Sequence, residues 1–226
     1  MPDFNFDFKK NINYKKKLIN FLKSLSNIEI GGNRIYDGIG NHYIQNPYEI
    51  AELIFFLKNY EIVNNYKFSN FLEIGFSAGI NNTIINKFFN FKKIVAIDIV
   101  QPTGISYNTF YSNLRFKNLT LLCGDSTKNE IINSVNLLGK YDLIFIDGGH
   151  DYETVKLDFE NYSNSLSNKG IIVLHDIKSN IVKGVPKYWR ELSIKKKKEF
   201  QFKEIFKKGS KMECGLGIVT KIKKND

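Results

Sequence analysis

Two unbroken apolar runs, residues 143–146 and 171–174, constrain the fold of this chain more than any other feature of its sequence. Runs without alternating polar residues are typical of parallel strands that are buried on both faces of a sheet. A segment with the apolar spacing of a helix lies between them, near residues 152–166. Parallel strands joined by a helix are the unit of an α/β fold, and the same order of strand and helix begins at about residue 68.

The full pattern predicts a Rossmann-like, doubly wound α/β domain with a seven-stranded, mostly parallel sheet and a final antiparallel strand. The last two strands are close enough in sequence to pair antiparallel. The strands are expected near residues 69–74, 93–98, 118–122, 141–147, 170–175, 200–206 and 215–222. Helices are expected near residues 79–89, 105–114, 128–138, 152–166 and 183–193.

A helical extension, residues 1–60, precedes the predicted domain, which spans residues 61–226. The extension begins with a helix near residues 14–25 and continues into a glycine-rich segment. Glycine-rich segments beside a site commonly close over ligands, so residues 31–45 are expected to form a mobile lid over the substrate.

A second helix of the extension has a sharp start signal. Asn46 can cap it, Pro47 suits its first position, and Glu49 stands three residues after the cap. This helix presents one apolar stripe to the rest of the chain.

Composition places the chain among folded globular proteins. It has 226 residues, of which 42% are hydrophobic and 14% aromatic, enough for one domain with a full core. We find no signal-peptide pattern and no run of transmembrane length. Cys123 and Cys214 are too few for a disulfide framework and follow no metal-binding spacing, so a reduced, cytoplasmic setting is expected.

The formal net charge of +10 has three interpretations. The lysines can contact nucleic acid, attract an acidic substrate or membrane surface, or form a solvated surface. The chain is also rich in Asn and Ile, a general compositional bias that favours the solvated surface. We therefore expect neither a nucleic acid nor a membrane as partner.

Asp147, His150, His175 and Asp176 follow the two central apolar strands. Open α/β sheets bind ligands just beyond the carboxyl ends of their parallel strands. These four side chains are therefore expected to meet in one cleft. We place the chemistry there, with Asp147 and His150 as catalytic residues.

A glycine-containing turn joins the first strand to the first helix of the domain. Gly75 and Gly79 permit positive φ angles and let a ligand approach the backbone closely. The helix that follows offers free amides to a carboxylate or phosphate. Asp98 ends the second strand, where a carboxylate can hold the two hydroxyls of a ribose. Together these features predict a cofactor that contains a nucleoside.

The same turn also fits the G-x-S-x-G pattern of a hydrolase nucleophile elbow, with Ser77 as the nucleophile. Asp147 and His175 then follow in the order of an α/β-hydrolase triad. An elbow normally comes after several strands, however, whereas this turn follows the first. A Ser77-dependent hydrolase is the weaker alternative.

The two regions together resemble class I S-adenosylmethionine-dependent methyltransferases. The most similar branch contains macrocin-type sugar O-methyltransferases and cephalosporin-hydroxylase-like proteins. The likeness spans about residues 46–219. It is carried by FLEIGFSAG from Phe71, AIDI from Ala96, GDST from Gly124, the block from IDGGHDYETVKLDF to KGIIVLHDI, GVPKYWREL from Gly184, and GLGIV from Gly215.

The resemblance implies S-adenosylmethionine as cofactor and assigns a role to each matching position. The acceptor it implies is a small molecule, a sugar or sugar nucleotide, and related enzymes often form homo-oligomers. The methionine end of the cofactor would be lined by Glu73, Gly75, Ser77 and Gly79, the ribose held by Asp98, and the adenine contacted by Asp125 and Ser126. Asp147 would also face the cofactor.

A divalent metal, Mg²⁺ or Mn²⁺, is implied at Asp147 and Asp176, with His150 as general base. Relatives often have glutamate where this chain has His175, which is a further candidate ligand. Its imidazole would shift the preference from Mg²⁺ toward Mn²⁺, Fe²⁺ or Zn²⁺. Neighbouring residues on a strand point to opposite faces, so His175 and Asp176 reach one ion only if the strand ends before them.

Two other functions compete with metal-assisted O-methylation of a sugar or similar polyhydroxylated small molecule. A nucleic-acid methyltransferase would fit the positive charge. Enzymes that methylate base amines commonly carry N/D-P-P-Y/F after the fourth strand, whereas this chain has Asp147-Gly-Gly-His150 there. A non-catalytic binding module would keep the cofactor cleft without using Asp147 and His150.

Overall fold

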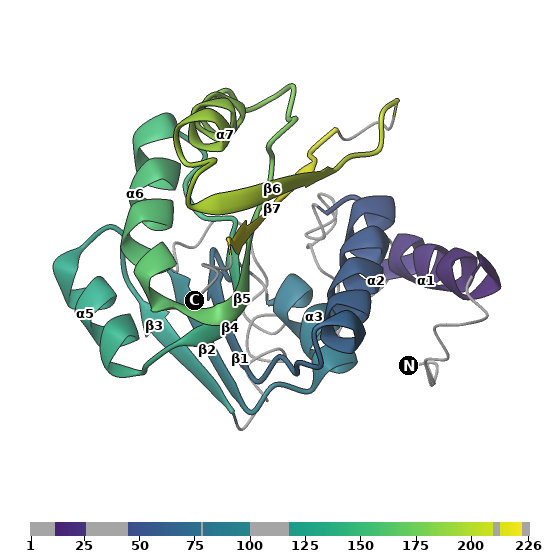
Figure 1. The fold of residues 1–226 in the computed structure, drawn as a ribbon, viewed down its shortest axis with the longest axis horizontal. Coiled ribbons are helices and arrows are strands. Elements are labelled where there is room, and N and C mark those ends of the chain that lie inside the picture. The colour runs from purple at the N-terminus through teal and green to yellow at the C-terminus, as the bar shows by residue number, and fades with distance from the viewer. Residues whose placement is uncertain (1–11, 26–44, 78, 100–117, 210–212, 223–226) are drawn as a thin grey trace, which may run out of the picture.

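The structure is a computed structural model that describes residues 12–25, 45–77, 79–99, 118–209 and 213–222 (Figure 1). The helix expected at residues 105–114 lies outside these ranges, as does the expected lid apart from Gln45. Within the described ranges, no helix has both the length and the apolar character needed to cross a membrane.

A seven-stranded sheet forms the centre of the molecule, in the order β3-β2-β1-β4-β5-β7-β6 (Figure 1). Neighbours from β3 to β5 pair parallel, and β7 runs antiparallel between β5 and β6. The predicted mostly parallel sheet with its antiparallel strand is confirmed. The strands are β1 Asn70–Ile74, β2 Lys93–Asp98, β3 Leu119–Cys123, β4 Tyr141–Ile146, β5 Leu166–Leu174, β6 Phe200–Ile205 and β7 Leu216–Lys221.

Helices cover both faces of the sheet (Figure 1). One layer contains α1 Ile12–Leu25, α2 Pro47–Val63 and α3 Ile80–Phe89, and the other contains α5 Asn129–Leu137, α6 Tyr152–Tyr162 and α7 Gly184–Lys195. The chain runs outward from β1 to β3 and then returns to β4 on the other side of β1. The strand order therefore reverses between β1 and β4.

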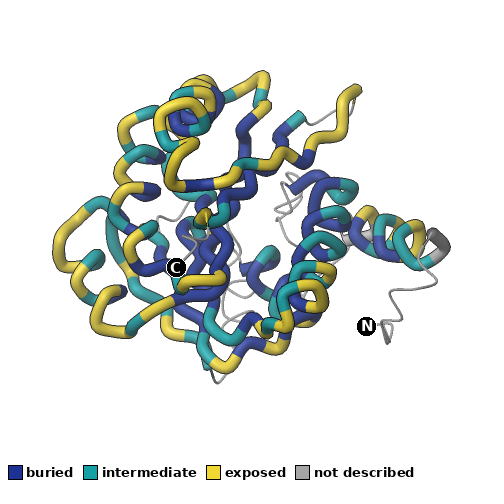
Figure 2. The backbone as a smooth tube through the Cα atoms, viewed as in Figure 1, coloured by how far each residue is buried: buried dark blue, intermediate teal, exposed yellow. Residues whose placement is uncertain are grey.

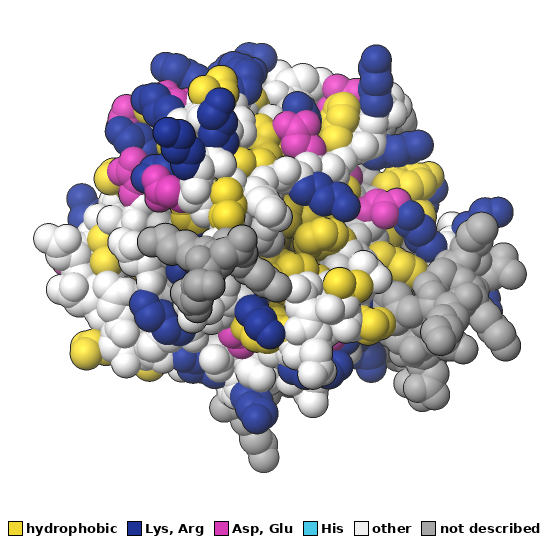
Figure 3. Space-filling view, in the orientation of Figure 1, with side chains coloured by type: hydrophobic (Ala, Val, Ile, Leu, Met, Phe, Trp, Pro, Cys, Tyr) yellow, Lys and Arg dark blue, Asp and Glu magenta, His cyan; other side chains and the backbone are white. Residues whose placement is uncertain are grey.

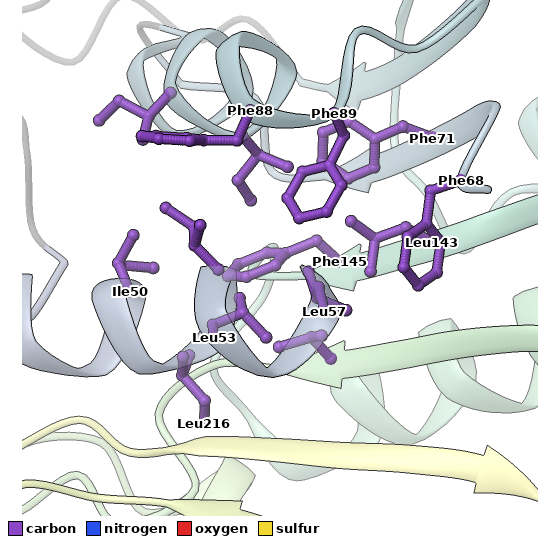
Figure 4. Packing of buried hydrophobic residues seen from close by; sticks show 14 of the residues in the cluster. Ile50, Leu53, Leu57, Phe68, Phe71, Phe88, Phe89, Leu143, Phe145 and Leu216 are labelled. Carbon is purple, nitrogen blue, oxygen red and sulfur yellow. The ribbon is translucent and has the colours of Figure 1, made fainter. Parts of the chain in front are cut away.

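The side chains of the strands alternate between two apolar cores, as the pleat requires. Phe71 and Phe145 point toward α2 and α3, where they pack with Leu53 and Leu57 (Figure 4). Leu72, Ile144 and Ile172 point the other way, toward α6 and α7. The central strands β1, β2 and β4 are buried, whereas the edge strands β3 and β6 and the outer faces of the helices are more exposed (Figure 2). Burial on both faces explains why the central strands are unbroken apolar runs.

Two neighbouring predicted boundaries are wrong: the end of the helix expected near 152–166 and the start of the strand expected near 170–175. The helix expected to reach residue 166 ends at Tyr162, and a single 3₁₀ turn, η2 Ser163–Ser165, follows it. Leu166 already pairs with Tyr141 at the start of β5, and the register shifts before Leu143 pairs with Ile171. Leu166 is buried in the second core from this strand position, so its apolar character does not mark a longer helix.

The start of α2 is confirmed, but one of its residues serves a different purpose. The side chain of Asn46 accepts from the amide of Tyr48 at 3.0 Å, and Pro47 is the first helical residue. The Glu49 carboxylate accepts from the amides of Lys207 at 3.0 Å and Gly215 at 2.8 Å. It therefore binds the start of α2 to the connection between β6 and β7.

Candidate active site

The turn after β1 passes directly against the end of β4. Gly75 has a φ of +89°, which favours glycine, and a Cβ added there would overlap the carbonyl oxygen of Asp147. The amide of Asp147 donates to the carbonyl oxygen of Ile74 at 2.8 Å. Ligands of open α/β sheets bind where the strand order reverses, which here is between β1 and β4. The predicted site therefore lies at the carboxyl ends of these two strands.

The rest of the glycine turn is held to β2 by Asp98. The amide of Ser77 donates to a carboxylate oxygen of Asp98 at 2.7 Å. Gly79, with a φ of +74°, precedes α3, and no side chain of the described residues caps this helix N-terminus. Amides of an uncapped first turn can hold an anionic group. The turn and the carboxylate predicted for the methionine and ribose parts of a cofactor are thus adjacent.

Glu73 is a buried carboxyl at the end of β1, only 1% exposed. Its Oε1 accepts from the side-chain amide of Asn81 at 2.8 Å, while its Oε2 has no hydrogen-bond partner among the described residues. Burial raises the pKa of Glu73 to about 8. A buried, half-satisfied carboxyl is costly unless a ligand completes it. A cationic group, such as the ammonium of the cofactor's methionine part, would do so.

Asp125 and Ser126, the predicted adenine contacts, form the turn after β3. Hydrogen bonds from the amide of Thr127 at 2.9 Å and its hydroxyl at 2.7 Å lower the pKa of Asp125. Ser126 is buried, and its carbonyl oxygen accepts from the hydroxyl of Tyr162 at 2.6 Å. Gly124 donates to the carbonyl oxygen that ends β2 at 2.8 Å. This turn is therefore adjacent to the predicted ribose position.

Asp147, His150, His175 and Asp176 converge as predicted. Nδ1 of His175 lies 2.9 Å from Oδ1 of Asp147 and 3.5 Å from Oδ2 of Asp176. Nε2 of His150 lies 3.2 Å from Oδ2 of Asp176 and 3.8 Å from Oδ1 of Asp147. Two imidazoles thus bridge the same two carboxylates. His175 is buried, whereas His150 is exposed and can meet a substrate.

The cluster stabilises the charged forms of His150, His175 and Asp176. A hydrogen bond with Asp176 raises the pKa of His150. Burial alone would lower the pKa of His175, but the charge of Asp147 and its hydrogen bonds outweigh burial and raise it. Burial would raise the pKa of Asp176, but hydrogen bonds with both imidazoles outweigh it and lower that pKa. A cation between the carboxylates would compete with the imidazolium protons for the same negative charge.

His175 and Asp176 reach the same site because β5 ends before them. The last residue of β5 is Leu174, and Asp176 has a φ of +63°. The strand alternation therefore no longer applies, and both side chains turn toward Asp147. The strand thus ends before both residues, which is the condition under which His175 and Asp176 can reach one ion.

Two overlapping groups of side chains, which share Asp176, could each hold a divalent cation. Asp147, His150 and Asp176 can each offer one ligand atom within 4.8 Å of the others, and so can His175, Asp176 and Cys214. Nε2 of His175 is buried and has no hydrogen-bond partner in the described ranges. Two carboxylates with one imidazole suit Mg²⁺ or Mn²⁺, whereas the group with the thiol suits a softer ion.

Sequence reasoning missed Gln45 and Cys214. The side-chain amide of Gln45 donates to Oδ2 of Asp147 at 2.7 Å, from the residue just before the cap of α2. Nothing in the local sequence marks it, because the contact depends on how α2 docks. Cys214 lies beside His175 because its carbonyl oxygen accepts from the amide of Lys178 at 2.7 Å. The antiparallel pairing of β7 with β5 is the signal that could have found it.

Ser77 has the backbone conformation that a hydrolase nucleophile would need, but not the contact with a histidine. Ser77 is exposed and has a φ of +48°, a positive angle of the kind found at strained turns. Its amide, however, is bonded to Asp98. Among the described residues, no hydrogen bond joins its hydroxyl to an imidazole, and His175 is instead bonded to Asp147. The arrangement therefore lacks the serine–histidine contact of a nucleophile elbow.

The sheet order, the glycine turn after β1 and the carboxylate that ends β2 define the fold of the S-adenosylmethionine-dependent methyltransferases. Residues 72–177 match the family described as a methyltransferase domain, so this part of the chain is similar to a methyltransferase domain. A 53-residue segment, 23% of the chain, is 42% identical to the protein y4gI of Sinorhizobium fredii. It covers 6% of that protein, so the chain matches only a small part of its curated relative.

Solved structures share the fold at low sequence identity. The N-methyltransferase NodS from Bradyrhizobium japonicum, in complex with S-adenosylhomocysteine, has a TM-score of 0.59 and 16% identity, over 91% of this chain and 99% of NodS. MycE from the mycinamycin biosynthetic pathway, in complex with Mg, S-adenosylhomocysteine and mycinamycin VI, has a TM-score of 0.53 and 14% identity, over 74% of this chain and 48% of MycE.

Proposed function

We propose that the protein transfers the methyl group of S-adenosylmethionine to a hydroxyl of a sugar or similar polyhydroxylated small molecule, with help from a divalent metal. One observation carries this proposal. Asp147, whose carboxylate faces both imidazoles, has its backbone directly against the Gly75 turn that we assign to the cofactor. MycE, whose complex contains Mg and mycinamycin VI, supports a metal in a protein of this fold.

Each part of the site has a task in this reaction. Glu73 and the Gly75 turn would hold the methionine part of the cofactor, and Asp98 the ribose. Asp147 and Asp176 would hold the metal, and His175 is a further candidate ligand through the overlapping group with Asp176 and Cys214. When bound, such an ion supplies Lewis acidity that favours deprotonation of an acceptor hydroxyl.

His150 would act as the general base because it is the exposed imidazole of the cluster. The acceptor oxygen forms a bond to the methyl carbon as the carbon–sulfur bond breaks, and the sulfur keeps the electron pair. The hydroxyl proton passes to Nδ1 of His150, because Nε2 of the same ring faces Asp176 at 3.2 Å, and that carboxylate stabilises the resulting imidazolium. The products are the methyl ether and S-adenosylhomocysteine. The enzyme contributes mainly by positioning the reactants and by this proton transfer.

The test is a methyl-transfer assay with the purified full chain. It would use S-adenosylmethionine labelled in the methyl group and a panel of sugars, sugar nucleotides and glycosylated small molecules, with Mg²⁺, with Mn²⁺ and with a chelator. Label in a hydroxyl-bearing product that is lost with the chelator is the expected result. Turnover that the chelator leaves unchanged would remove the metal from the proposal. Label found only in amine acceptors would replace O-methylation by N-methylation.

A nucleic-acid acceptor is the second candidate, favoured by the net charge of +10. Against it, basic and acidic side chains intermingle on the face seen in Figure 3. Lys195 pairs with Glu191 at 2.7 Å, and Lys196 pairs with Glu199 at 2.9 Å. A phosphate backbone is better matched by an unpaired basic stripe. Labelled RNA and DNA in the same assay would decide between the two acceptor classes.

A further inference from the structure

Asp158, in the middle of α6, is a completely buried carboxyl that the proposed reaction does not use. Its exposed fraction is 0%, and neither carboxylate oxygen has a hydrogen-bond partner of normal geometry among the described residues. Buried polar groups are rarely left in this state, and a buried carboxyl is costly to fold around. An apolar residue would fill this place in the second core at a lower cost. The carboxyl therefore calls for a functional explanation.

Asp158 lies close to two turns at the edge of the sheet where we propose that the cofactor binds. A Cβ added to Gly148, in the turn after β4, would lie 3.4 Å from Oδ2 of Asp158. Burial raises the pKa of Asp158 to about 7, and the side chain of Ser126, in the turn after β3, opposes that rise. The buried carboxyl of Asp158 thus lies beside Gly148, and it interacts with Ser126 in the turn after β3.

Tyr162, one helical turn after Asp158, contacts the same turn. Its hydroxyl is buried and donates to the carbonyl oxygen of Ser126 at 2.6 Å. Residues four apart lie on one face of a helix, so α6 holds Ser126 at its side chain and at its backbone. Since Ser126 is 9% exposed, its surroundings fix where the turn sits.

We propose that Asp158 and Tyr162 are positioning residues that hold the turn at Ser126, and with it Gly148, in the shape that receives the adenine end of the cofactor. This inference rests on the proposed function, because that function places a nucleoside at this edge. The neighbouring carboxylate Asp98 supports the placement, since the amide of Gly124 ties the two strand ends together at 2.8 Å. A base attached to a ribose at Asp98 reaches the turn after β3.

The test is calorimetric binding of two ligands to the full chain, S-adenosylhomocysteine and 5′-methylthioadenosine. The second ligand carries the nucleoside but lacks the amino-acid end. Tyr162→Phe removes one hydroxyl and should weaken both ligands equally, by about three- to tenfold, because the carbonyl oxygen of Ser126 loses its partner. Asp158→Leu should act in the same way. Asp158→Asn, which keeps the shape and the hydrogen-bonding capacity, should bind both ligands within about twofold of the wild type.

Asn81→Ala is the matched control because it changes the partner of Glu73 at the methionine end. It should weaken S-adenosylhomocysteine and leave 5′-methylthioadenosine unchanged. If a folded Tyr162→Phe protein binds both ligands like the wild type, the inference is overturned, even if Asp158→Leu does not fold. A loss confined to S-adenosylhomocysteine in these variants would also overturn it. A wild-type protein that binds neither ligand would instead refute the proposed function.

Discussion

Gln45 and Asp147 are 102 residues apart in the chain, and a hydrogen bond of 2.7 Å joins the Gln45 amide nitrogen to Oδ2 of Asp147. The other oxygen, Oδ1, faces His175. The residue just before the cap of α2 therefore reaches into the cluster of carboxylates and imidazoles at the ends of β4 and β5. Gln45 fixes the rotation of the carboxylate on which the proposed metal site and base depend.

Gln45→Ala is expected to lower kcat by about tenfold, because Asp147 loses a hydrogen bond that orients it. Affinity for S-adenosylhomocysteine should change little, since Gln45 bonds to Asp147 and not to the carboxylates proposed to hold the cofactor, Glu73 and Asp98. Steady-state kinetics and calorimetry check the two effects. Gln201→Ala, which changes an exposed glutamine on β6, is the control and should leave both unchanged. A fully active Gln45→Ala protein would contradict the positioning role.

His150→Ala is expected to lower the rate of methyl transfer by about 10²–10⁴-fold while cofactor affinity stays the same, as for a lost general base. In the wild type the rate should rise with pH. Only the neutral imidazole can accept a proton. Because Asp176 raises the pKa of His150, the neutral form becomes predominant at a higher pH than for an ordinary histidine. A pH–rate profile of wild type and variant measures both effects. Unchanged turnover in the variant would exclude His150 from the mechanism.

The two overlapping metal groups predict different responses to mutation. Asp176→Asn removes a carboxylate that both groups share, and asparagine tolerates the positive φ of this position. It should weaken Mn²⁺ binding by more than about tenfold, as measured by electron paramagnetic resonance. Cys214→Ser should leave Mn²⁺ binding unchanged if the ion lies between Asp147 and Asp176. A loss of affinity in Cys214→Ser would place the ion in the buried group with His175.

The sequence was most informative where a function depends on the end of a buried strand. The convergence of Asp147 with His175 follows from parallel strands alone, so the apolar runs predicted it. The roles of Gln45, Cys214 and Asp158 depend on docking between elements, which no local pattern encodes. The predicted helix past Tyr162 failed for a related reason, because a register shift in β5 has no sequence signature. These roles become visible only from the packing between distant segments, which the periodicity of the sequence does not encode.

Glu73→Gln is expected to make the ligand-free protein more stable at alkaline pH. The pKa of Glu73 is about 8 in the folded chain against an ordinary value of 4.5, because burial disfavours its ionised form. Between these values the folded state binds more protons than the unfolded state. The free energy of unfolding therefore falls as pH rises, by about 1.4 kcal/mol per pH unit for this group. Glutamine cannot ionise, so the variant should lose this part of the slope.

Urea unfolding at pH values of about 5, 7 and 9 measures the slope. Asp158, whose pKa is about 7, acts in the same direction and should leave a smaller residual slope in the variant. The effect of the substitution on cofactor binding should be the opposite of its effect on stability. The variant should bind the ligand more weakly, because the ammonium group of the ligand needs the ionised Glu73 carboxylate. We expect Glu73→Gln to bind S-adenosylhomocysteine at least about tenfold more weakly. A variant that is stabilised at high pH yet binds the ligand like the wild type would show that Glu73 is buried for reasons other than the cofactor.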